Sequence, residues 1–368
     1  MSAFSNSDRE FMARALRLAA RGMDTTDPNP RVGCVVVRDG RVVGEAWHER
    51  AGESHAEPRA LQAAGDAAAG ATAYVTLEPC AAQGRRAPCT EALLAARVAR
   101  VVYATEDPNP SKCGGAEQLR AAGVVVQGGL LAGEARALNP GFFKRHERGL
   151  PFVRVKMGVS LDGRSALANG ASRWITGPAA RQDAQRYRAR SSVVLTGVGT
   201  VLGDDPAMNV RVEGASRQPL RVVLDSHLRC PPAARIFGRD GPSLVFGIED
   251  HSQRRAALEA AGARVEILPA ADGSRVPLRP MLQRLAALHA NEVWVEAGAT
   301  LAGALLTEDL VDELIVYLAP CLLGSDARGL ADLPVLQSLE QRLRLRFLDA
   351  HPIEDDLRIT AAVLPKEG

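Results

Sequence analysis

The sequence of 368 residues is poor in aromatic residues and almost without net charge. Phenylalanine, tyrosine and tryptophan together make up 4 %, and the formal net charge at pH 7 is +2. Proteins that hold single-stranded nucleic acid combine a basic groove with stacking aromatic side chains, so this composition argues against nucleic acid as the partner. No run of about 18 apolar residues occurs, so we expect no membrane-spanning helix and no membrane partner.

Cysteine is also scarce, with six residues scattered along the chain. Small secreted proteins that depend on disulfides have a far higher density, so we expect free thiols and a reducing compartment. The first 22 residues carry Arg9, Arg14 and Arg17 within their apolar pattern and lack the continuous apolar core of a signal peptide. These observations predict a cytoplasmic protein.

The remaining composition is that of an ordinary globular protein, with 46 % apolar and 24 % charged residues. A chain of this length exceeds the size at which one core stops growing, so two domains are expected. The charged segment 141–151, GFFKRHERGLP, precedes a new apolar strand pattern. We therefore expect domains at residues 1–147 and 148–368.

Helix and strand patterns alternate in both halves, which predicts an α/β fold with sheets covered by helices. In the first half, an amphipathic helix over 8–21 precedes two strands within 32–48 that turn at Asp39-Gly40. Helices are then expected at 55–65, 89–99 and 114–123, and strands at 71–79, 98–105 and 124–129. The strands expected in the second half are 151–160, 191–198, 220–226, 242–248, 263–269, 292–298 and 312–320.

A His-Ala-Glu sequence begins at His55 and ends at Glu57. Two of the six cysteines, Cys80 and Cys89, lie further along the chain. A catalytic zinc ion takes three protein ligands and leaves its fourth position to water. His55, Cys80 and Cys89 could supply these ligands, while Glu57 could carry a proton from the water to a leaving group. The same arrangement occurs in zinc-dependent nucleobase deaminases.

These residues have other interpretations. The two cysteines could form a disulfide or pack as buried apolar side chains, and a His-x-Glu sequence often arises by chance. The Cys-x8-Cys spacing also differs from the usual Cys-x2-Cys of deaminases. The complete string, GESHAE followed by a predicted helix and YVTLEPC, favours the metal site.

Five motifs of the first half resemble the pyrimidine deaminases of the riboflavin pathway, which are commonly fused to a reductase. They are NPRVGC at 29–34, HAE at 55–57, TLEPC at 76–80, GRRAPC at 84–89 and DPNP at 107–110. The resemblance implies a cytidine-deaminase-like α/β/α domain in which Cys-x8-Cys is the ordinary spacing. It also implies that His55, Cys80 and Cys89 bind Zn²⁺ and that Glu57 is the catalytic proton donor.

The chain departs from this family pattern next to the first cysteine. Ala81-Ala82-Gln83 stands where the family has Ser-His-His, and Arg86-Ala87 stands where it has Thr-Pro. Pro58 follows Glu57, in a first helical turn that tolerates proline. These differences concern substrate contacts at Ala82 and Gln83 rather than the metal ligands.

The second half contains no Gly-x-Gly-x-x-Gly fingerprint, so it does not fit a standard dinucleotide-binding fold. Two glycine-rich strand ends remain, within 191–206 and 292–306. In the second of these, Gly298 precedes a predicted helix start near Thr300. Backbone N–H groups at a helix start attract anions, and a glycine lets a phosphate approach closely, although an ordinary strand-to-helix loop looks the same.

The order of motifs in the second half resembles the reductase of the same pathway: KMGVSLDGR (156–164), SRWIT (172–176), RQDAQRYRAR (181–190), TGVGTVLGDDP (196–206) and VEAGATLAGALL (295–306). That domain resembles dihydrofolate reductase in fold and uses NADPH. The implied cofactor contacts are Gly158, Trp174, Thr200, Asp204, Ser226, Gly298, Ala299, Thr300, Leu301, Ala302, Gly303 and Ala304. The implied substrate contacts are Ser172, Arg188, Met208, Arg211 and Glu296.

The chemistry of these residues agrees with such roles. Arg188 and Arg211 offer fork-shaped donors for a ribose phosphate, and Trp174 offers a flat wall for an aromatic ring. A carboxylate at Glu296 could bind ribose hydroxyls. Taken singly, however, an arginine on a helix is usually solvated and a tryptophan is usually part of the core.

The resemblance as a whole implies a bifunctional, homo-oligomeric enzyme that acts on a phosphoribosylaminopyrimidine. It would first remove an amino group with zinc and then reduce the ribosyl chain with NADPH. The residues identify no proton donor for the reductive step, for which water could serve. An editing deaminase of nucleic acid and a zinc protein that senses a nucleotide without catalysis are the alternatives.

Overall fold

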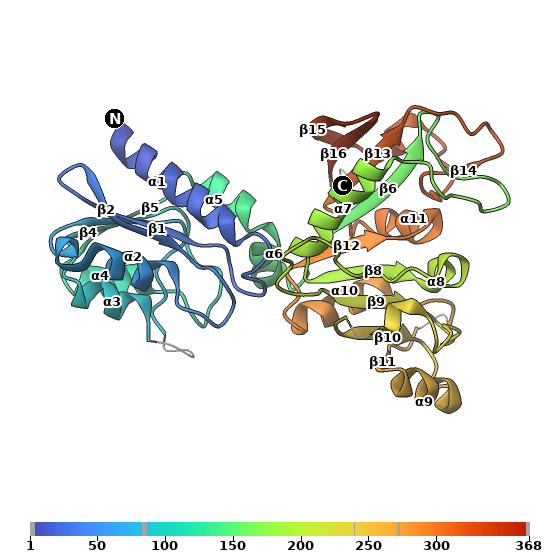
Figure 1. Ribbon diagram of the computed structural model, residues 1–368, viewed down its shortest axis with the longest axis horizontal. Coiled ribbons are helices and arrows are strands. Elements are labelled where there is room, and N and C mark those ends of the chain that lie inside the picture. The colour runs from blue at the N-terminus through green and yellow to red at the C-terminus, as the bar shows by residue number, and fades with distance from the viewer. Residues whose placement is uncertain (1–3, 83–86, 239, 271–272, 366–368) are drawn as a thin grey trace. The chain divides into compact units, whose positions relative to one another are not determined.

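The computed structural model describes residues 4–82, 87–238, 240–270 and 273–365 (Figure 1). The chain divides into two compact units, Met1–Gly149 and Leu150–Gly368. None of the described helices is long and apolar enough to cross a membrane. Each unit has its own sheet, covered on both faces by helices.

The first unit is built on a five-stranded sheet of order β2-β1-β3-β4-β5. Strand β1 is antiparallel to β2 and β3, whereas β3, β4 and β5 run parallel. Its elements are α1 (Asn6–Ala19), β1 (Gly33–Arg38), β2 (Arg41–Trp47), α2 (Ala56–Ala64), β3 (Thr72–Val75), α3 (Cys89–Ala95), β4 (Arg100–Tyr103), α4 (Gly115–Ala121), β5 (Val125–Gly128), α5 (Ala132–Leu138) and α6 (Pro140–Arg148).

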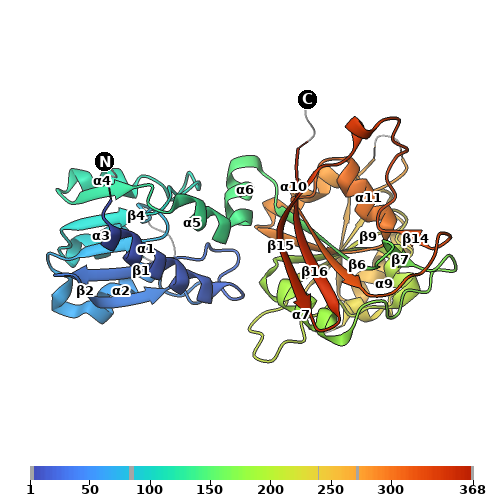
Figure 2. The same cartoon turned by 90° about the horizontal axis from the view of Figure 1, so that it is seen from above.

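Successive residues of the central strands face opposite sides of this sheet, and each side has its own core. Val35 and Val37 face Met12 and Leu18 of α1, whereas Cys34 and the other alternate residues pack under α2 and α3. The hairpin expected at Asp39-Gly40 is confirmed, since both residues take the positive φ angles, 51° and 74°, of a tight two-residue turn. This layering agrees with the expected α/β/α arrangement (Figure 2).

A buried carboxylate connects α1 to two inner strands of this sheet. Asp8 forms a capping box with Ser5 at the start of α1. Its other oxygen accepts hydrogen bonds of 2.7 Å from the hydroxyl of Tyr74 in β3 and from Nη1 of Arg100 in β4. Burial opposes ionisation of Asp8, but Arg100, Tyr74 and Ser5 hold its pKa well below the usual range.

The segment expected to be a charged boundary is a helix for most of its length. Helix α6 runs to Arg148, and its residues Phe142 and Phe143 are buried in the core of the first unit. The first unit ends one residue later, at Gly149, which has the positive φ of a helix C-terminus.

The second unit contains a nine-stranded sheet of order β11-β10-β9-β8-β12-β6-β13-β16-β15. In this order, all strands from β11 through β6 to β13 run parallel. At one edge, β16 is antiparallel to β13 and β15 is antiparallel to β16. Its elements are β6 (Phe152–Ser160), β7 (Arg164–Ala166), α7 (Pro178–Arg190), β8 (Val193–Gly197), α8 (Val198–Asp204), β9 (Leu220–Leu224), β10 (Ser243–Gly247), α9 (Ser252–Ala260), β11 (Ala263–Ile267), α10 (Leu278–Ala287), β12 (Glu292–Glu296), α11 (Ala299–Thr307), β13 (Glu313–Ala319), β14 (Arg328–Gly329), β15 (Leu345–Ile353) and β16 (Asp356–Val363).

All seven strands expected in this half are present, but the sequence did not reveal the hairpin of β15 and β16. Almost every residue of β15 is exposed, so this strand lacks the alternation of apolar and polar residues that marks a half-buried strand. Its position depends on pairing with β16 (Figure 2), which pairs in turn with β13 (Figure 1).

Candidate functional sites

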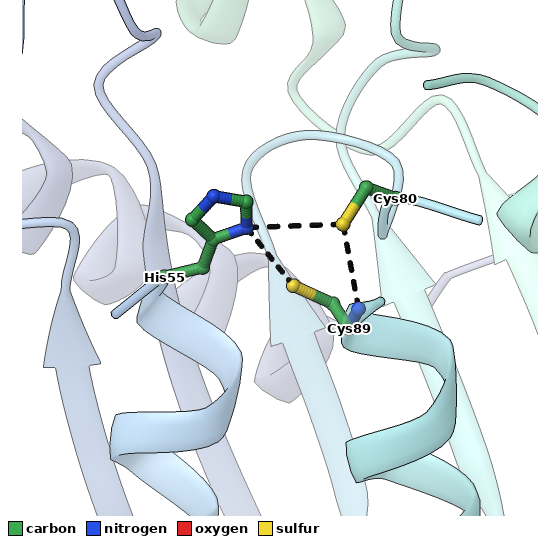
Figure 3. Close-up of side chains that lie close together, drawn as sticks. All are labelled: His55, Cys80 and Cys89. Atoms are coloured by element: carbon green, nitrogen blue, oxygen red, sulfur yellow. Dashed lines mark hydrogen bonds between the residues drawn. The ribbon is translucent and has the colours of Figure 1, made fainter. Parts of the chain in front are cut away.

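Three side chains of the first unit converge where two helices begin (Figure 3). His55 immediately precedes α2, Cys89 is the first residue of α3, and Cys80 lies on the loop that follows β3. Nδ1 of His55 lies 3.2 Å from Sγ of Cys89 and 3.8 Å from Sγ of Cys80. The three ligand atoms all lie within 4.8 Å of one another.

These distances fit a zinc ion. Tetrahedral coordination with Zn–N of about 2.05 Å and Zn–S of about 2.3 Å separates nitrogen from sulfur by about 3.6 Å, between the two distances observed. Within the described residues, no fourth histidine, cysteine or carboxylate joins the cluster. The donor set therefore leaves one position of a tetrahedral ion open, as in catalytic rather than structural zinc sites.

The surroundings favour the thiolate form of Cys80. The hydrogen bond with the Cys89 thiol, supported by His55 and by the backbone N–H of Cys89, lowers the pKa of Cys80 to about 4. The N–H of Cys89, at the start of α3, donates to Sγ of Cys80 over 3.3 Å. A helix start of this kind stabilises negative charge on sulfur.

Glu57 lies in the first turn of α2, two residues from His55, and is almost completely buried, with 3 % of its surface exposed. Burial raises the pKa of its carboxyl group above the ordinary value. A buried carboxyl group with a raised pKa is suited to general acid–base catalysis.

His48, which the sequence analysis did not single out, holds the ring of His55 in place. The ring of His48 packs edge-on against that of His55, with centroids 5.4 Å apart. Asn29 lies 3.0 Å from Nε2 of His48, and the carbonyl oxygen of Ser54 lies 3.1 Å from its Nδ1. His48 is buried, and this burial lowers its pKa.

Glu78 of the TLEPC motif stabilises the loop that contains the DPNP motif. Its carboxylate accepts hydrogen bonds from the backbone N–H groups of Ala116, at 3.0 Å, and Asp107, at 3.3 Å. A Cβ atom at Gly115 would lie 1.7 Å from the carbonyl oxygen of Pro79, so α4 can approach the Cys80 loop only because this residue is glycine. Gln83 lies outside the described residues, and the carbonyl oxygen of Ala82 accepts a 3.3 Å hydrogen bond from Lys112.

The second unit contains a large cleft, with a volume of about 2560 Å³. It lies where β8, β9 and β12 end, so it is at the carboxyl edge of the parallel strands, where open α/β sheets bind ligands. The lining includes Gly158, Ser172, Trp174, Arg188, Thr200, Asp204, Met208, Arg211, Ser226, Glu296, Gly298, Ala299, Thr300, Leu301 and Ala304.

Two of the residues expected to contact the cofactor do not line this cleft. Ala302 is completely buried in the core. Gly303 packs against the backbone of Asp332, where a Cβ atom would lie 2.1 Å from the carbonyl oxygen. Both lie on the inner face of α11, so they hold the helix in place and present no side chain to the cleft.

The floor of the cleft holds a buried ion pair between Arg188 of α7 and Glu296 of β12. Nε and Nη2 of Arg188 donate to the two carboxylate oxygens over 2.5 and 2.8 Å. Nη1 of Arg188 donates to the carbonyl oxygen of Asn209, and Nε1 of Trp294 donates to Glu296 over 2.7 Å. Burial alone would raise the pKa of Glu296, but the charge of Arg188 and these hydrogen bonds lower it to about 2.

Lys156 in the central strand β6 also lines the cleft, although the sequence analysis placed it only within the motif KMGVSLDGR. Burial lowers the pKa of Lys156, while the nearby charge of Glu296 opposes this shift. A Cβ atom at Gly158 would lie 3.3 Å from Nζ of Lys156, so this glycine leaves room for the amine. A charged residue between Val155 and Met157 in a largely apolar central strand is the sequence signal that could have indicated this position.

Comparison with known proteins matches each part of the chain to a family model. Residues 5–105 match the model of the cytidine and deoxycytidylate deaminase zinc-binding region, and residues 151–359 match that of the RibD C-terminal domain. The riboflavin biosynthesis protein RibD of Escherichia coli is 48 % identical over 363 residues, which cover 95 % of this chain and 98 % of that protein. The chain belongs to the RibD family.

Solved RibD structures have the same architecture. Acinetobacter baumannii RibD superimposes with a TM-score of 0.91 at 43 % identity and covers 98 % of this chain and 99 % of its own. A Thermotoga maritima diaminohydroxyphosphoribosylaminopyrimidine deaminase/5-amino-6-(5-phosphoribosylamino)uracil reductase gives a TM-score of 0.87 at 29 % identity, over 97 % of this chain and 99 % of its own.

Membership of the RibD family settles the class of activity. The chain is a bifunctional deaminase and reductase of riboflavin biosynthesis, with a zinc-binding deaminase domain followed by a RibD reductase domain. Its cofactors are zinc and NADPH. The editing deaminase and the non-catalytic zinc sensor considered for the sequence are thereby set aside.

Proposed function

We propose that residues 1–147 hydrolyse the 2-amino group of 2,5-diamino-6-(5-phosphoribosylamino)pyrimidin-4(3H)-one, and that residues 148–368 then reduce 5-amino-6-(5-phosphoribosylamino)uracil to its ribitylamino product. The observation that carries this proposal is the convergence of His55, Cys80 and Cys89 in one unit and the buried Arg188–Glu296 pair in the cleft of the other. Two separate sites suit two successive reactions, with no nucleic acid involved.

In the deamination, the pyrimidine C–NH₂ group and water become a C=O group and ammonia. His55, Cys80 and Cys89 would hold zinc, which when bound supplies the Lewis acidity that makes a water molecule nucleophilic at neutral pH. Glu57 would take one proton from the attacking water and deliver it to the departing amino group, a role that its raised pKa favours. His48 acts indirectly, because its packing sets the orientation of the His55 ring.

In the reduction, the opened ribosylamine accepts a hydride at C1′ and a proton at nitrogen. NADPH, when bound, would supply the hydride, and the start of helix α11 at Gly298 would border it in the cleft. A Cβ atom at Gly298 would meet no protein atom within 4 Å, so the start of α11 is open to a phosphate group. Lys156, whose pKa is lowered, provides the proton donor that the sequence did not identify.

The remaining substrate contacts follow from the charges in the cleft. Arg211 lies at the cleft surface and keeps most of its donors for a phosphate, with Nη1 donating to Asn209 Oδ1 over 2.9 Å. Ser172, Met208 and Glu296 line the same cleft and complete the substrate side. Glu296, ionised by its pairing with Arg188, accepts hydrogen bonds from ribose hydroxyls.

The test follows both half-reactions in one preparation. Ammonia release from the diaminopyrimidine phosphate and loss of NADPH absorbance are measured before and after treatment with a chelator. Chelation is expected to abolish ammonia release while the reduction of added 5-amino-6-(5-phosphoribosylamino)uracil continues. Loss of both reactions in a folded protein would contradict the assignment of one reaction to each unit.

We also propose that the protein is a homo-oligomer in the cytoplasm. Strand β15 is an edge strand of the large sheet, and Leu345, Phe347 and Leu348 on it are exposed to 44 %, 74 % and 48 %. An unpaired edge with exposed apolar residues is suited to cover by a second copy. All six cysteines are free thiols, which supports a reducing compartment.

The oligomer is tested by the molar mass of the protein in solution, measured by light scattering. Phe347→Glu places a charge on the exposed face of β15 and is expected to shift the mass towards that of one chain. An unchanged oligomer would place the interface elsewhere. Cell fractionation tests the compartment.

A further inference from the structure

The second unit holds another group of metal-binding side chains, away from the deaminase cluster. His227 follows β9, whereas Glu249 and His251 follow the neighbouring strand β10. Because these strands are parallel and adjacent, their carboxyl ends bring the three residues together at the same edge of the sheet. Their ligand atoms lie within 4.8 Å of one another.

The distances in this group are those of metal ligands rather than of hydrogen bonds. Oε2 of Glu249 lies 3.4 Å from Nε2 of His251 and 3.8 Å from Nδ1 of His227. Both separations exceed the usual limit of about 3.2 Å for an N–H···O hydrogen bond. Nitrogen and oxygen atoms bound to one tetrahedral zinc ion, at about 2.05 Å each, lie about 3.4 Å apart.

The backbone of both loops is fixed before any ion binds. The N–H of Ile248 donates to the carbonyl oxygen of Ser226 over 3.0 Å, which ties the two loops together. Nη1 of Arg254 in α9 donates to the carbonyl oxygen of His227 over 2.8 Å. His251 immediately precedes α9, and its carbonyl oxygen accepts a hydrogen bond from the N–H of Arg255.

We propose that His227, Glu249 and His251 form a second binding site for a divalent transition-metal ion of the zinc, cobalt or nickel class. Two imidazole nitrogens and one carboxylate select such ions over magnesium and calcium, which prefer oxygen ligands. The three side chains are 46 %, 57 % and 39 % exposed, so water completes the coordination. His227 also lines the cleft, which places the ion at its rim.

The experiment counts metal ions in the full chain. The protein is stripped with a chelator, loaded with Co²⁺ and dialysed, and bound cobalt is measured by mass spectrometry. Two ions per chain are expected for the unchanged protein. The variant His227→Ala/His251→Ala is expected to keep one ion together with its sulfur-to-cobalt charge-transfer absorption. The variant Cys80→Ser/Cys89→Ser is expected to keep one ion without that absorption.

Controls separate this site from chance binding. His351→Ala removes an exposed histidine of β15 and is expected to leave two ions. Glu249→Gln, which keeps the shape of the loop, is expected to lose the second ion as well, and far-ultraviolet circular dichroism checks that both variants fold. A single ion in the unchanged protein, or two ions in the folded His227→Ala/His251→Ala variant, would overturn the proposal.

Discussion

The carboxylate of Glu296 and the guanidinium of Arg188 form a two-pronged ion pair, with N···O distances of 2.5 and 2.8 Å. The two residues are separated by 108 positions and come from β12 and α7. Because the pair is buried, Arg188 gives most of its donors to protein acceptors and keeps Glu296 ionised. Arg188 therefore affects the substrate partly through Glu296.

This pairing makes the pH dependence of the reductase testable. Glu296 has a pKa of about 2, so it is ionised across the neutral range. In Arg188→Met the charge that lowers this pKa is lost while burial, which raises it, remains. The pKa of the carboxylate should then rise, although Lys156 and Trp294 still lower it, and kcat/KM of NADPH oxidation should develop an acid limb at a higher pH than in the unchanged protein.

The matched control for this profile is Arg211→Ala. It removes a cationic side chain from the same cleft without breaking the ion pair, so kcat/KM should fall by a similar factor at every pH. The KM for the phosphorylated substrate should rise more than that for NADPH in both variants. A flat profile in Arg188→Met would show that Arg188 does not control the ionisation of Glu296.

Glu57→Gln tests the proton carrier of the deaminase. Glutamine keeps the size of the side chain but cannot take up a proton, so ammonia release should fall by about 10²- to 10⁴-fold. Bound zinc and reductase activity should be unchanged, since Glu57 is not one of the converging ligands. Glu53→Gln, an exposed residue on the preceding loop, is the control and should keep full activity.

Asp8→Asn tests the buried carboxylate that connects α1 to β3 and β4. The change weakens the bonds from Arg100 and Tyr74 and leaves the Arg100 charge without its partner, so the free energy of unfolding of the first unit should fall by about 2–3 kcal/mol at pH 7. Urea denaturation measures this value. Glu10→Gln, an exposed change on the same helix, should leave it unaltered.

The same carboxylate should also determine part of the acid sensitivity. The pKa of Asp8 is depressed in the folded state, so its stabilisation is complete above the unfolded pKa of about 3.9 and is lost as the pH falls below it. The stability of Asp8→Asn should depend less steeply on pH in that range. Equal slopes for the two proteins would contradict a depressed pKa.

Gly303→Ala tests the close contact behind α11. Alanine normally stabilises a helix by about 1 kcal/mol relative to glycine. Here its Cβ atom would lie 2.1 Å from the carbonyl oxygen of Asp332, so the segment that contains Asp332 must move away. We expect a lower melting temperature and a higher KM for NADPH. Gly329→Ala, where a Cβ atom meets no atom within 4 Å, should change neither.

The sequence predicted those features that depend on residues close together in the chain or on a recognisable motif. The repeating strands and helices, the turn at Asp39-Gly40 and the proposed ligands of the metal site belong to this group. The apolar patterns were strong because the central strands are buried on both faces.

Other features arise only when distant segments meet, and the sequence could not show them. His48 braces His55, and Arg188 is bound to Glu296, through contacts that depend on the folded sheets. Residues Ala302 and Gly303 belong to a matching motif but face the core, because a helix turns successive residues towards different surroundings. The motif at 295–306 therefore identified this segment but did not indicate which of its side chains face the cleft.

The central position of β6 in the large sheet affects how the chain can fold during synthesis. Both partners of β6 are encoded far downstream: Phe152 pairs with Glu292 and Arg154 with Glu313. The first unit can fold as soon as residue 149 leaves the ribosome, whereas β6 must wait for about 170 more residues before both of its edges are covered. The reductase is therefore the part of the nascent protein that depends most on protection from premature aggregation.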